Sequence, residues 1–281
     1  MPKSRRRQHL PWNAAGRMSE VHGDGDSVVR ETGWVFNNRM GRALTLAEFV
    51  DSGEEEVHSY LIHFGFTPED NARASLVEIG AGIGRMTAGF TRRFQSVVAC
   101  DLDAAFLERC RETVARFGRP ERLSTLHTPD GRSLHLADQS VDMVFSYITL
   151  QHCERHDALN LTAEAVRILK PGGHVVLNYR TWVWRDVLLY PIGVIMRRLW
   201  RVPVIGPRLA RMRWSTRLGW QANRLSPEAV FDYLETHDVE LESPAVWVKR
   251  TRRMRIPEGI AVKTYFGINP SHWWLIARRG S

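Results

Sequence analysis

The chain has 281 residues, of which 43% are hydrophobic and 25% are charged. This balance fits one large globular domain, or one domain with an inserted lobe, and excludes a disordered or fibrous protein. Three cysteines without a C-x-x-C pair or a Cys/His cluster at metal-ligand spacing predict a reduced, cytoplasmic protein with no metal site. No apolar stretch of about 18 residues occurs, so we expect no membrane-spanning helix.

The formal net charge is +8, and the positive charge is concentrated in one segment. Between Asp186 and Glu228 there is no acidic residue, whereas the same stretch contains many arginines. These arginines are Arg197, Arg198, Arg201, Arg208, Arg211, Arg213, Arg217 and Arg224. We therefore assign the positive field to one segment and not to the whole surface.

The first elements can be predicted from local signals. Residues 1–27 are polar, basic and rich in glycine, and we expect a flexible arm there, with residues 28–281 forming the globular domain. Ser52-Gly-Glu-Glu55 has the form of a capping box, which predicts a helix over 53–65. The apolar run 75–79 ends in a glycine-rich turn and predicts a buried strand.

Helical and strand segments then alternate along the chain. We expect helices at 84–94, 103–117 and 157–169, and strands at 96–101, 122–127, 140–146 and 173–179. This alternation predicts βαβ units and a parallel sheet with helices on both faces. The periodicity is lost in residues 181–225, which are rich in Trp and Arg. A helix is expected to begin at Ser226-Pro227, and two further strands near 239–248 and at 272–277.

Glycines follow the first strand at alternate positions, as Glu78-Ile-Gly80-Ala-Gly82-Ile-Gly84. Glycine lets the backbone turn sharply and lets a ligand lie against it. The N-terminus of the next helix would point free N–H groups at that ligand. Nucleotide-binding Rossmann folds share this pattern, and a tight turn without a ligand is the alternative.

Acidic residues follow the next two strands. Asp101 ends the second strand about 20 residues after the glycines, where a carboxylate can accept hydrogen bonds from a ribose. Asp103 competes for this role, but it fits better as the N-cap of the helix at 103–117. Asp130-Gly131 follows the third strand. Its carboxylate is either an acceptor for the amine of adenine or part of a simple Asp-Gly turn.

With Leu169-Lys-Pro-Gly-Gly173 added, these motifs resemble the class I S-adenosylmethionine (SAM)-dependent methyltransferases. The resemblance covers residues 75–180 and includes the strand 142–146 that leads to Leu150-Gln-His152. A dinucleotide-binding G-x-G-x-x-G would need glycine where Arg85 stands. The resemblance implies an α/β fold with a Rossmann-like, mostly parallel sheet of seven strands and SAM as the cofactor. It also implies that the basic residues 181–225 form a helical insertion, or lid, after the fifth strand.

The resemblance also implies positions for the parts of the cofactor. Its methionine part would lie near Glu78 to Gly84 and its ribose at Asp101, with the adenine at Leu102, Asp130 and Gly131. Ser146 and Tyr147 would border the sulfonium. Arg85 would either pair with the cofactor carboxylate or be a solvated helix residue.

Catalysis of methyl transfer needs mainly the alignment of two reactants, because the sulfonium is already activated. A hydroxyl acceptor is helped by a general base, whereas an amine needs only its lone pair. His152 is the first candidate for the base, since its ordinary pKa lies near neutrality. Its alternative is a packing role in the loop before the next helix. Tyr147 is the second catalytic candidate, followed by Tyr179 and His156.

The segment 181–225 indicates what accepts the methyl group. Its tryptophans and arginines fit a small-molecule acceptor that is aromatic or lipid-like and carries an anionic group, methylated at O or N. The uncharged run 187–196 is too short to span a bilayer, but it suits contact of 187–217 with an anionic membrane surface. An ordinary amphipathic lobe with a solvated basic face is the simplest alternative.

Two other functions stay open at this point, as do the acceptor, its target atom and the oligomeric state. An RNA methyltransferase would use the basic region 181–255 to bind phosphates and stack on bases. Nucleic acid is the less favoured partner, because no RNA-binding module is recognisable. A non-catalytic SAM-binding protein would keep the cofactor motifs without methyl transfer.

Overall fold

The computed structural model describes residues 25–26, 28–29, 44–210, 212–219, 222–249 and 254–280. They belong to two compact units, one ending at Asp130 and the other beginning at Gly131, which are described in turn. The predicted arm at 1–27 lies outside the described residues apart from Gly25 and Asp26. Asp26 Oδ1 accepts a hydrogen bond of 2.7 Å from the backbone N–H of Leu46.

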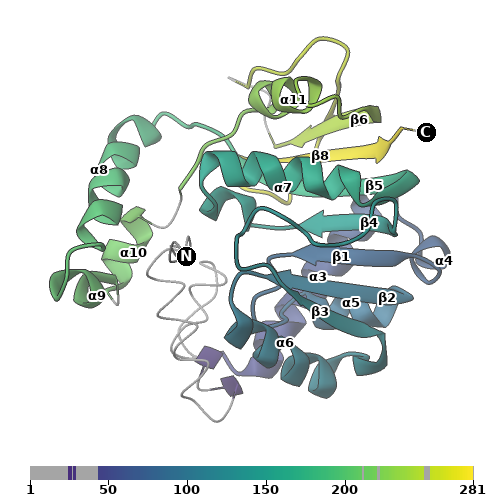
Figure 1. Ribbon diagram of the computed structural model, residues 1–281, viewed down its shortest axis with the longest axis horizontal. Helices are drawn as coiled ribbons and strands as arrows, with labels where there is room; N and C mark the ends of the chain where they lie inside the picture. Colours follow the sequence, from purple (N-terminus) through teal and green to yellow (C-terminus); the bar gives the residue numbers. More distant parts are fainter. Residues whose placement is uncertain are drawn as a thin grey trace, which may run out of the picture. The chain divides into compact units, whose positions relative to one another are not determined.

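The N-terminal unit contains three parallel strands in the order β3-β2-β1 (Figure 1). They are β1 (Ser75–Ile79), β2 (Ser96–Asp101) and β3 (Leu123–His127). Helices are α3 (Leu46–His63), α4 (Pro68–Asn71), α5 (Thr87–Arg93), α6 (Ala104–Phe117) and the 3-10 helix η1 (Pro120–Arg122). Ile79 of β1 pairs with Cys100 of β2, so the glycine turn and Asp101 emerge at the same edge.

Helix α3 begins earlier than predicted, at Leu46. Its capping box is Thr45 with Glu48: the Glu48 N–H donates to Thr45 Oγ1 at 3.2 Å, and the Thr45 N–H donates to Glu48 Oε2 at 2.8 Å. Ser52 lies inside the helix, where its hydroxyl donates to the Phe49 carbonyl at 2.6 Å. The earlier start is favoured because it buries Leu46 and Phe49.

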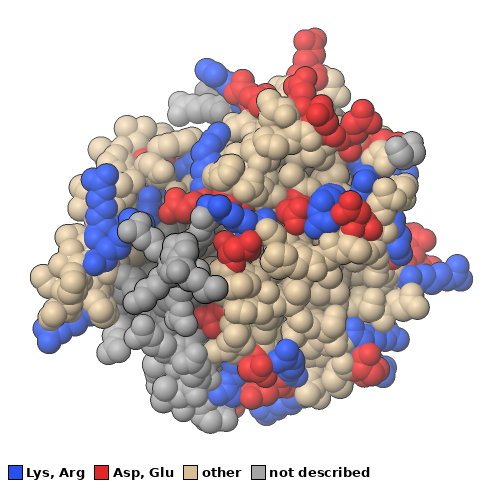
Figure 2. Space-filling view, in the orientation of Figure 1, with Lys and Arg blue, Asp and Glu red and all other residues tan. Residues whose placement is uncertain are grey.

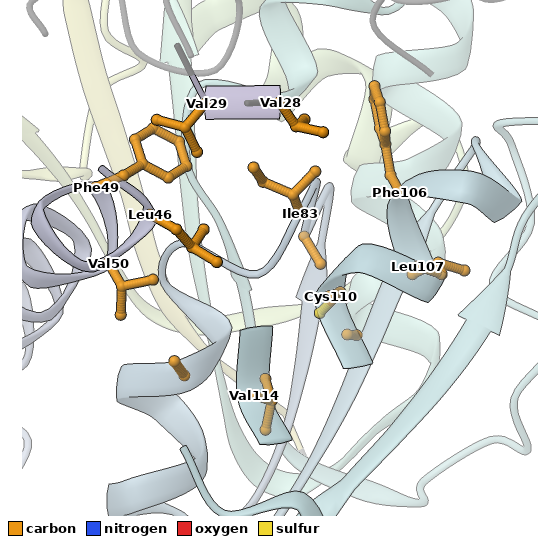
Figure 3. Packing of buried hydrophobic residues seen from close by; sticks show 13 residues of the cluster. Val28, Val29, Leu46, Phe49, Val50, Ile83, Phe106, Leu107, Cys110 and Val114 are labelled. Carbon is orange, nitrogen blue, oxygen red and sulfur yellow. The ribbon is translucent and has the colours of Figure 1, made fainter. Parts of the chain in front are cut away.

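A hydrophobic cluster lies directly behind the glycine turn (Figure 3). Ile83 of the turn points into this cluster between α3 and α6. The cluster contains Val28, Val29, Leu46, Phe49, Val50, Ile83, Phe106, Leu107, Cys110 and Val114, together with three alanines. Close packing on this side gives the turn a fixed shape.

The C-terminal unit has five strands among its described residues, in the order β4-β5-β8-β6-β7. They are β4 (Val141–Ser146), β5 (Leu169–Arg180), β6 (Leu241–Val248), β7 (Ala261–Thr264) and β8 (His272–Arg279). β4 and β5 are parallel, whereas β8 is antiparallel to both β5 and β6. The unit also holds η2 (Leu150–His152), α7 (Arg155–Arg167) and α11 (Pro227–Glu235). Ser226 is the N-cap of α11, as predicted.

Strand β7 is the main departure from the predicted sheet, which had seven strands. With β7, the described part of the chain has eight strands. All four of its residues are exposed, and it pairs with β6 at the edge. The alternation of buried and exposed residues that indicates a strand in a sequence is therefore absent from it.

The segment after β5 forms a helical lobe, α8–α10, which spans residues 186–219 (Figure 1). Its helices are α8 (Asp186–Leu199), α9 (Ile205–Ala210) and α10 (Arg213–Gly219), and α8 packs against α10. Trp200 is buried in the lobe and its indole N–H donates to Ser215 Oγ at 2.8 Å. Arg211, Trp220, Arg252 and Arg253 of the predicted basic region lie outside the described residues.

Candidate cofactor site

The glycine turn after β1 has a backbone that only glycine adopts easily. Gly80, Gly82 and Gly84 have φ values of 81°, 56° and 90°. A Cβ on Gly84 would lie 3.2 Å from backbone atoms of Cys110 in α6. The predicted sharp turn is thus present, and its third glycine is also needed for close approach to α6.

Asp101 holds this turn in place. Its Oδ2 accepts from the Gly82 N–H at 2.8 Å, and its Oδ1 accepts from the Asp103 N–H at 3.0 Å. A carboxylate offers about four lone-pair positions, so each oxygen keeps room for another donor. Burial raises the pKa of Asp101 to about 6, against the opposing effect of these backbone hydrogen bonds.

Asp103 has the structural role that fits its position. Its Oδ1 accepts from the Ala105 N–H at 2.9 Å, which makes it the N-cap of α6. The two neighbouring acids therefore have different partners: Asp103 caps α6, whereas Asp101 accepts from the glycine turn.

Glu78, near the end of β1, is buried and contacts the start of α5. Its Oε2 accepts from the Thr87 hydroxyl at 2.6 Å. Burial raises the pKa of Glu78 to about 7, although this hydrogen bond and Arg85 act in the opposite direction. The side chain is thus poised to be neutral or charged near physiological pH.

Arg85 is not a solvated helix residue. It precedes α5 and is buried, with its Nη2 2.6 Å from Glu56 Oε2 and its Nη1 3.4 Å from Ser52 Oγ, both in α3. Its guanidinium also lies over the Phe49 ring, 5.8 Å from the centroid. A partner from α3 neutralises Arg85 in this structure, and its pairing with the cofactor carboxylate stays a prediction.

The loop after β3 contains the predicted Asp-Gly turn, in which Gly131 has a φ of 62°. Just before it, Thr128 donates to the Asp101 carbonyl through its N–H at 2.9 Å and its hydroxyl at 3.1 Å. The Leu102 carbonyl lies 3.1 Å from His127 Nε2. These bonds tie the ends of β2 and β3 together around Leu102.

In the C-terminal unit, Ser146 ends β4 and is fully buried. The ring of Tyr147 stacks on Trp274 of β8, with centroids 5.4 Å apart and planes 4° from parallel. Ile148 follows with a φ of 53°. This conformation costs a β-branched residue about 1–3 kcal/mol, and such strain is often found at functional loops.

His152 ends η2, and the structure places it against Gln151, with 3.3 Å between Nε2 of each side chain. Asn223 fixes this loop from a distant part of the sequence. Its Nδ2 donates to the carbonyls of Leu150 at 2.6 Å and Cys153 at 2.8 Å. Sequence reasoning missed Asn223, because it lies in the non-periodic segment and no local pattern marks it.

Two weaker catalytic candidates have structural roles. Tyr179 is buried in the core, shares a 2.7 Å hydrogen bond with the Thr162 hydroxyl and stacks on Trp273, and its burial raises its pKa. It is therefore a core residue and not a base. His156 is exposed on α7, where it contacts the ring of Tyr233 edge-on.

Within the described ranges, no three or more His, Cys, Asp or Glu side chains come together in a way that could hold a metal ion. Within the same ranges, no helix has the length and apolar character needed to cross a bilayer.

Comparison with known proteins adds to this geometry. A family profile described as a methyltransferase domain matches residues 77–177. The uncharacterized protein YafE of Escherichia coli K12 is 30% identical over 187 residues, which cover 65% of this chain and 81% of that protein. The chain belongs to the class I SAM-dependent methyltransferases. This result confirms the predicted family, the enzyme class and the cofactor SAM.

Other relatives of this methyltransferase match over shorter stretches. Malonyl-[acyl-carrier protein] O-methyltransferase of Methylococcus capsulatus is 33% identical over 109 residues, 37% of each chain. Phosphoethanolamine N-methyltransferase 1 of Triticum aestivum is 32% identical over 109 residues, 38% of this chain and 21% of that protein. This methyltransferase therefore spans well under half the length of these two relatives.

The fold also has solved counterparts. Magnesium protoporphyrin IX methyltransferase from Synechocystis PCC 6803, solved with bound SAH, superposes with a TM-score of 0.52. The match has 12% identity and covers 91% of this chain and 98% of that one. At this identity the likeness shows the α/β methyltransferase fold, and nothing of the acceptor.

Proposed function

We propose that this protein transfers the methyl group of SAM to oxygen or nitrogen of a small-molecule acceptor. The observation that carries the proposal is the hydrogen bond between Gly82 and Asp101. It joins the glycine turn to an acid at the position where a carboxylate can accept hydrogen bonds from a ribose. Relatives named as O- and N-methyltransferases support a small-molecule acceptor.

In this proposal the N-terminal unit binds the adenosyl part of SAM. The glycine turn from Gly80 to Gly84 lies along the methionine part, and Asp101 accepts hydrogen bonds from the ribose hydroxyls. Leu102 and Asp130 are proposed to contact the adenine. The roles of Gly131, Ser146 and Tyr147 rest on the family resemblance alone.

The reaction is an in-line displacement. A lone pair of the acceptor O or N forms a bond to the methyl carbon while the carbon–sulfur bond breaks, and the sulfonium becomes the thioether of S-adenosylhomocysteine. The acceptor proton goes to a base, for which we propose His152. The Gln151 amide N–H can only donate to His152 Nε2, so this contact has to open before Nε2 accepts the acceptor's proton.

The test begins with calorimetric titration of SAM into the full chain. We expect binding, and well-folded protein that binds no SAM would refute the proposal. Labelled SAM is then incubated with separated small-molecule, lipid and RNA fractions. Labelling of the small-molecule or lipid fraction supports the proposal; labelling of RNA alone, with binding that falls steeply with salt, favours the RNA alternative. SAM binding without any labelling favours a non-catalytic protein.

We also propose that the α8–α10 lobe contacts an anionic membrane. Most of the large exposed apolar side chains described for this chain lie in or beside the lobe. They are Trp182, Trp184, Val187, Leu188, Leu189, Ile192, Ile195, Leu199, Val202, Val204, Ile205, Met212 and Trp214. Exposed Arg198, Arg201, Arg208 and Arg217 lie among them, and Figure 2 shows mostly tan and blue over this lobe. Apolar side chains and arginines together suit insertion into anionic lipid headgroups.

Vesicle co-sedimentation tests the membrane contact. We expect binding to phosphatidylglycerol vesicles and much less to phosphatidylcholine vesicles. Ile195→Glu should abolish this binding, whereas Ile62→Glu should not, because Ile62 is on α3 and outside the lobe. The two variants are matched, since the side chains have similar exposures of 56% and 59%. Equal binding by both variants would contradict the proposal and favour a solvated lobe.

A further inference from the structure

A buried charge cluster lies where α8 leaves β5. Asp186, the first residue of α8, is 1% exposed. Its Oδ1 accepts from Nη2 of Arg180 and from Nη2 of Arg224, each at 3.0 Å. Its Oδ2 accepts from the backbone N–H of Val183 at 3.0 Å. One carboxylate thus serves two guanidinium groups.

The two arginines are left with more charge and more donors than this carboxylate satisfies. The side chains of Arg180 and Arg224 are only 12% and 7% exposed. Arg180 Nη1 and Arg224 Nε are buried with no hydrogen-bond partner among the described residues. Leaving a buried donor unsatisfied is costly, and more so when the donor is charged. Burial, with Arg224 nearby, lowers the pKa of Arg180 to about 10.

The aromatic side chain of Tyr190 lies against Arg224 of the cluster. The Tyr190 ring lies 5.4 Å from the Arg224 guanidinium carbon and 5.7 Å from that of Arg197, a third, half-buried arginine. Trp182 packs on Tyr190, with ring centroids 5.0 Å apart, and is 48% exposed.

The cluster is joined to the loop that carries His152. Arg180 is the last residue of β5, and its carbonyl accepts from the Leu225 N–H at 2.9 Å. Arg224 directly follows Asn223, whose amide holds the carbonyls on both sides of Gln151 and His152. Ligands of open α/β sheets bind outside the carboxyl ends of the strands, which is where Arg180 stands.

We propose that Arg180 and Arg224 form a binding site for an oxyanion, the carboxylate or phosphate group of the methyl acceptor. The anion supplies acceptors for Arg180 Nη1 and Arg224 Nε. Guanidinium N–H groups form strong charge-assisted hydrogen bonds to carboxylate and phosphate oxygens, and here each arginine offers one unpartnered donor. Only the statement that the anion belongs to the acceptor rests on the proposed function; the site itself does not.

A purely structural ion cluster is the competing explanation. In that case Asp186 would anchor α8 to β5, and the unpaired donors would be a tolerated cost. The two explanations differ in how the cluster responds to Asp186. If the cluster is purely structural, removal of the Asp186 charge only lowers the stability of the protein. If it is an anion site, the same change raises the affinity for the anion, because a competing negative charge is lost.

The test uses inorganic phosphate and acetate as probes for the full chain, with chloride adjusted to constant ionic strength. We expect a saturable rise of the unfolding midpoint with one of them, and the stronger probe tells whether phosphate or carboxylate is preferred. Arg224→Gln should raise the half-saturating concentration by about tenfold or more, because a charge-assisted contact is lost. Arg198→Gln, an exposed arginine of α8, is the matched control and should behave as the unaltered protein.

If Arg224→Gln does not fold, Asp186→Asn distinguishes the anion site from a purely structural cluster. It should lower the half-saturating concentration, and absence of any saturable effect in the unaltered chain would overturn the site. A variant with Asp101→Ala, impaired in SAM binding, should keep the phosphate or acetate response. In the unaltered chain, a saturable phosphate or acetate response without SAM binding refutes the proposed function and leaves the anion site standing, whereas SAM binding without such a response refutes the anion site alone.

Discussion

The backbone N–H of Gly82 lies 2.8 Å from Oδ2 of Asp101, so the turn after β1 is hydrogen-bonded to the end of β2. Asp103 occupies the other carboxylate oxygen through its own N–H at 3.0 Å. The acid proposed to bind the ribose is therefore the acid that shapes the glycine turn. One side chain thus holds the turn in its form and keeps oxygen lone pairs for further donors.

Replacing Asp101 should impair SAM binding far more than replacing its neighbour. Asp101→Ala removes the acceptor for the ribose and releases Gly82, and we expect SAM to bind about a hundredfold more weakly. Asp103→Ala removes only the N-cap of α6, which costs about 1 kcal/mol of stability and leaves the affinity nearly unchanged. Calorimetric titration of both variants measures the difference, and equal losses would contradict the role given to Asp101.

Glu78 should make the protein less stable as the pH rises. Burial raises its pKa from 4.5 to about 7, so between these values the folded state binds more protons than the unfolded state. The stabilising effect is complete below about pH 4.5 and is lost as the pH passes 7. Glu78→Gln removes this dependence. The difference in unfolding free energy between the two proteins should change by about 2–3 kcal/mol from pH 5 to 8, measured with urea.

Strands β1 and β2 have the bounds predicted from the sequence, because each is an apolar run closed by a clear turn signal. The predicted start of α3 was wrong, because the sequence contains two segments with the form of a capping box. They are Thr45 to Glu48 and Ser52 to Glu55. The local pattern does not distinguish these two segments. The burial of Leu46 and Phe49 favours the first one as the start of the helix. The edge strand β7 was missed because it buries nothing.

The third glycine of the turn gives a sharp test of its geometry. Gly84→Ala meets both a positive φ and backbone atoms of Cys110 at 3.2 Å, so we expect a loss of about 2–4 kcal/mol. Gly172→Ala, in β5, has a φ of 75° but open space around the new methyl group. It should cost only about 1–2 kcal/mol. Urea denaturation compares the two variants, and similar losses would contradict the close contact with α6.

Arg85 should matter for stability through Glu56. Glu56→Gln leaves the buried guanidinium without its charged partner and should cost about 1–3 kcal/mol, with little change in SAM affinity. Glu108→Gln removes an exposed pair with Arg111 on α6 and should change stability by less than about 0.5 kcal/mol. Thermal unfolding and SAM titration test both statements. A large loss of SAM affinity in Glu56→Gln would contradict this expectation and favour Arg85 as a cofactor ligand.

The candidate site was predictable where its residues are close in sequence to a strand end. Gly82 and Asp101 were each predicted as cofactor contacts, because each stands at or just after the carboxyl end of a predicted parallel strand. Partners that come from distant segments could not be predicted. Glu56 reaches Arg85 from α3, and Asn223 reaches the His152 loop from beyond the α8–α10 lobe.

Asn223 should control the position of His152 without touching the reactants. Asn223→Ala removes two hydrogen bonds to the carbonyls of Leu150 and Cys153, so the loop between them should exchange its amide protons faster. Because misplacement of a catalytic group is costly, kcat with the acceptor found by labelling should fall about tenfold to a hundredfold, with a smaller change in the KM for SAM. Asn160→Ala on α7 removes a contact with Tyr233 and is the control. If Asn223→Ala loosens the loop but keeps kcat, His152 is not the base, because its placement then has no effect on the rate.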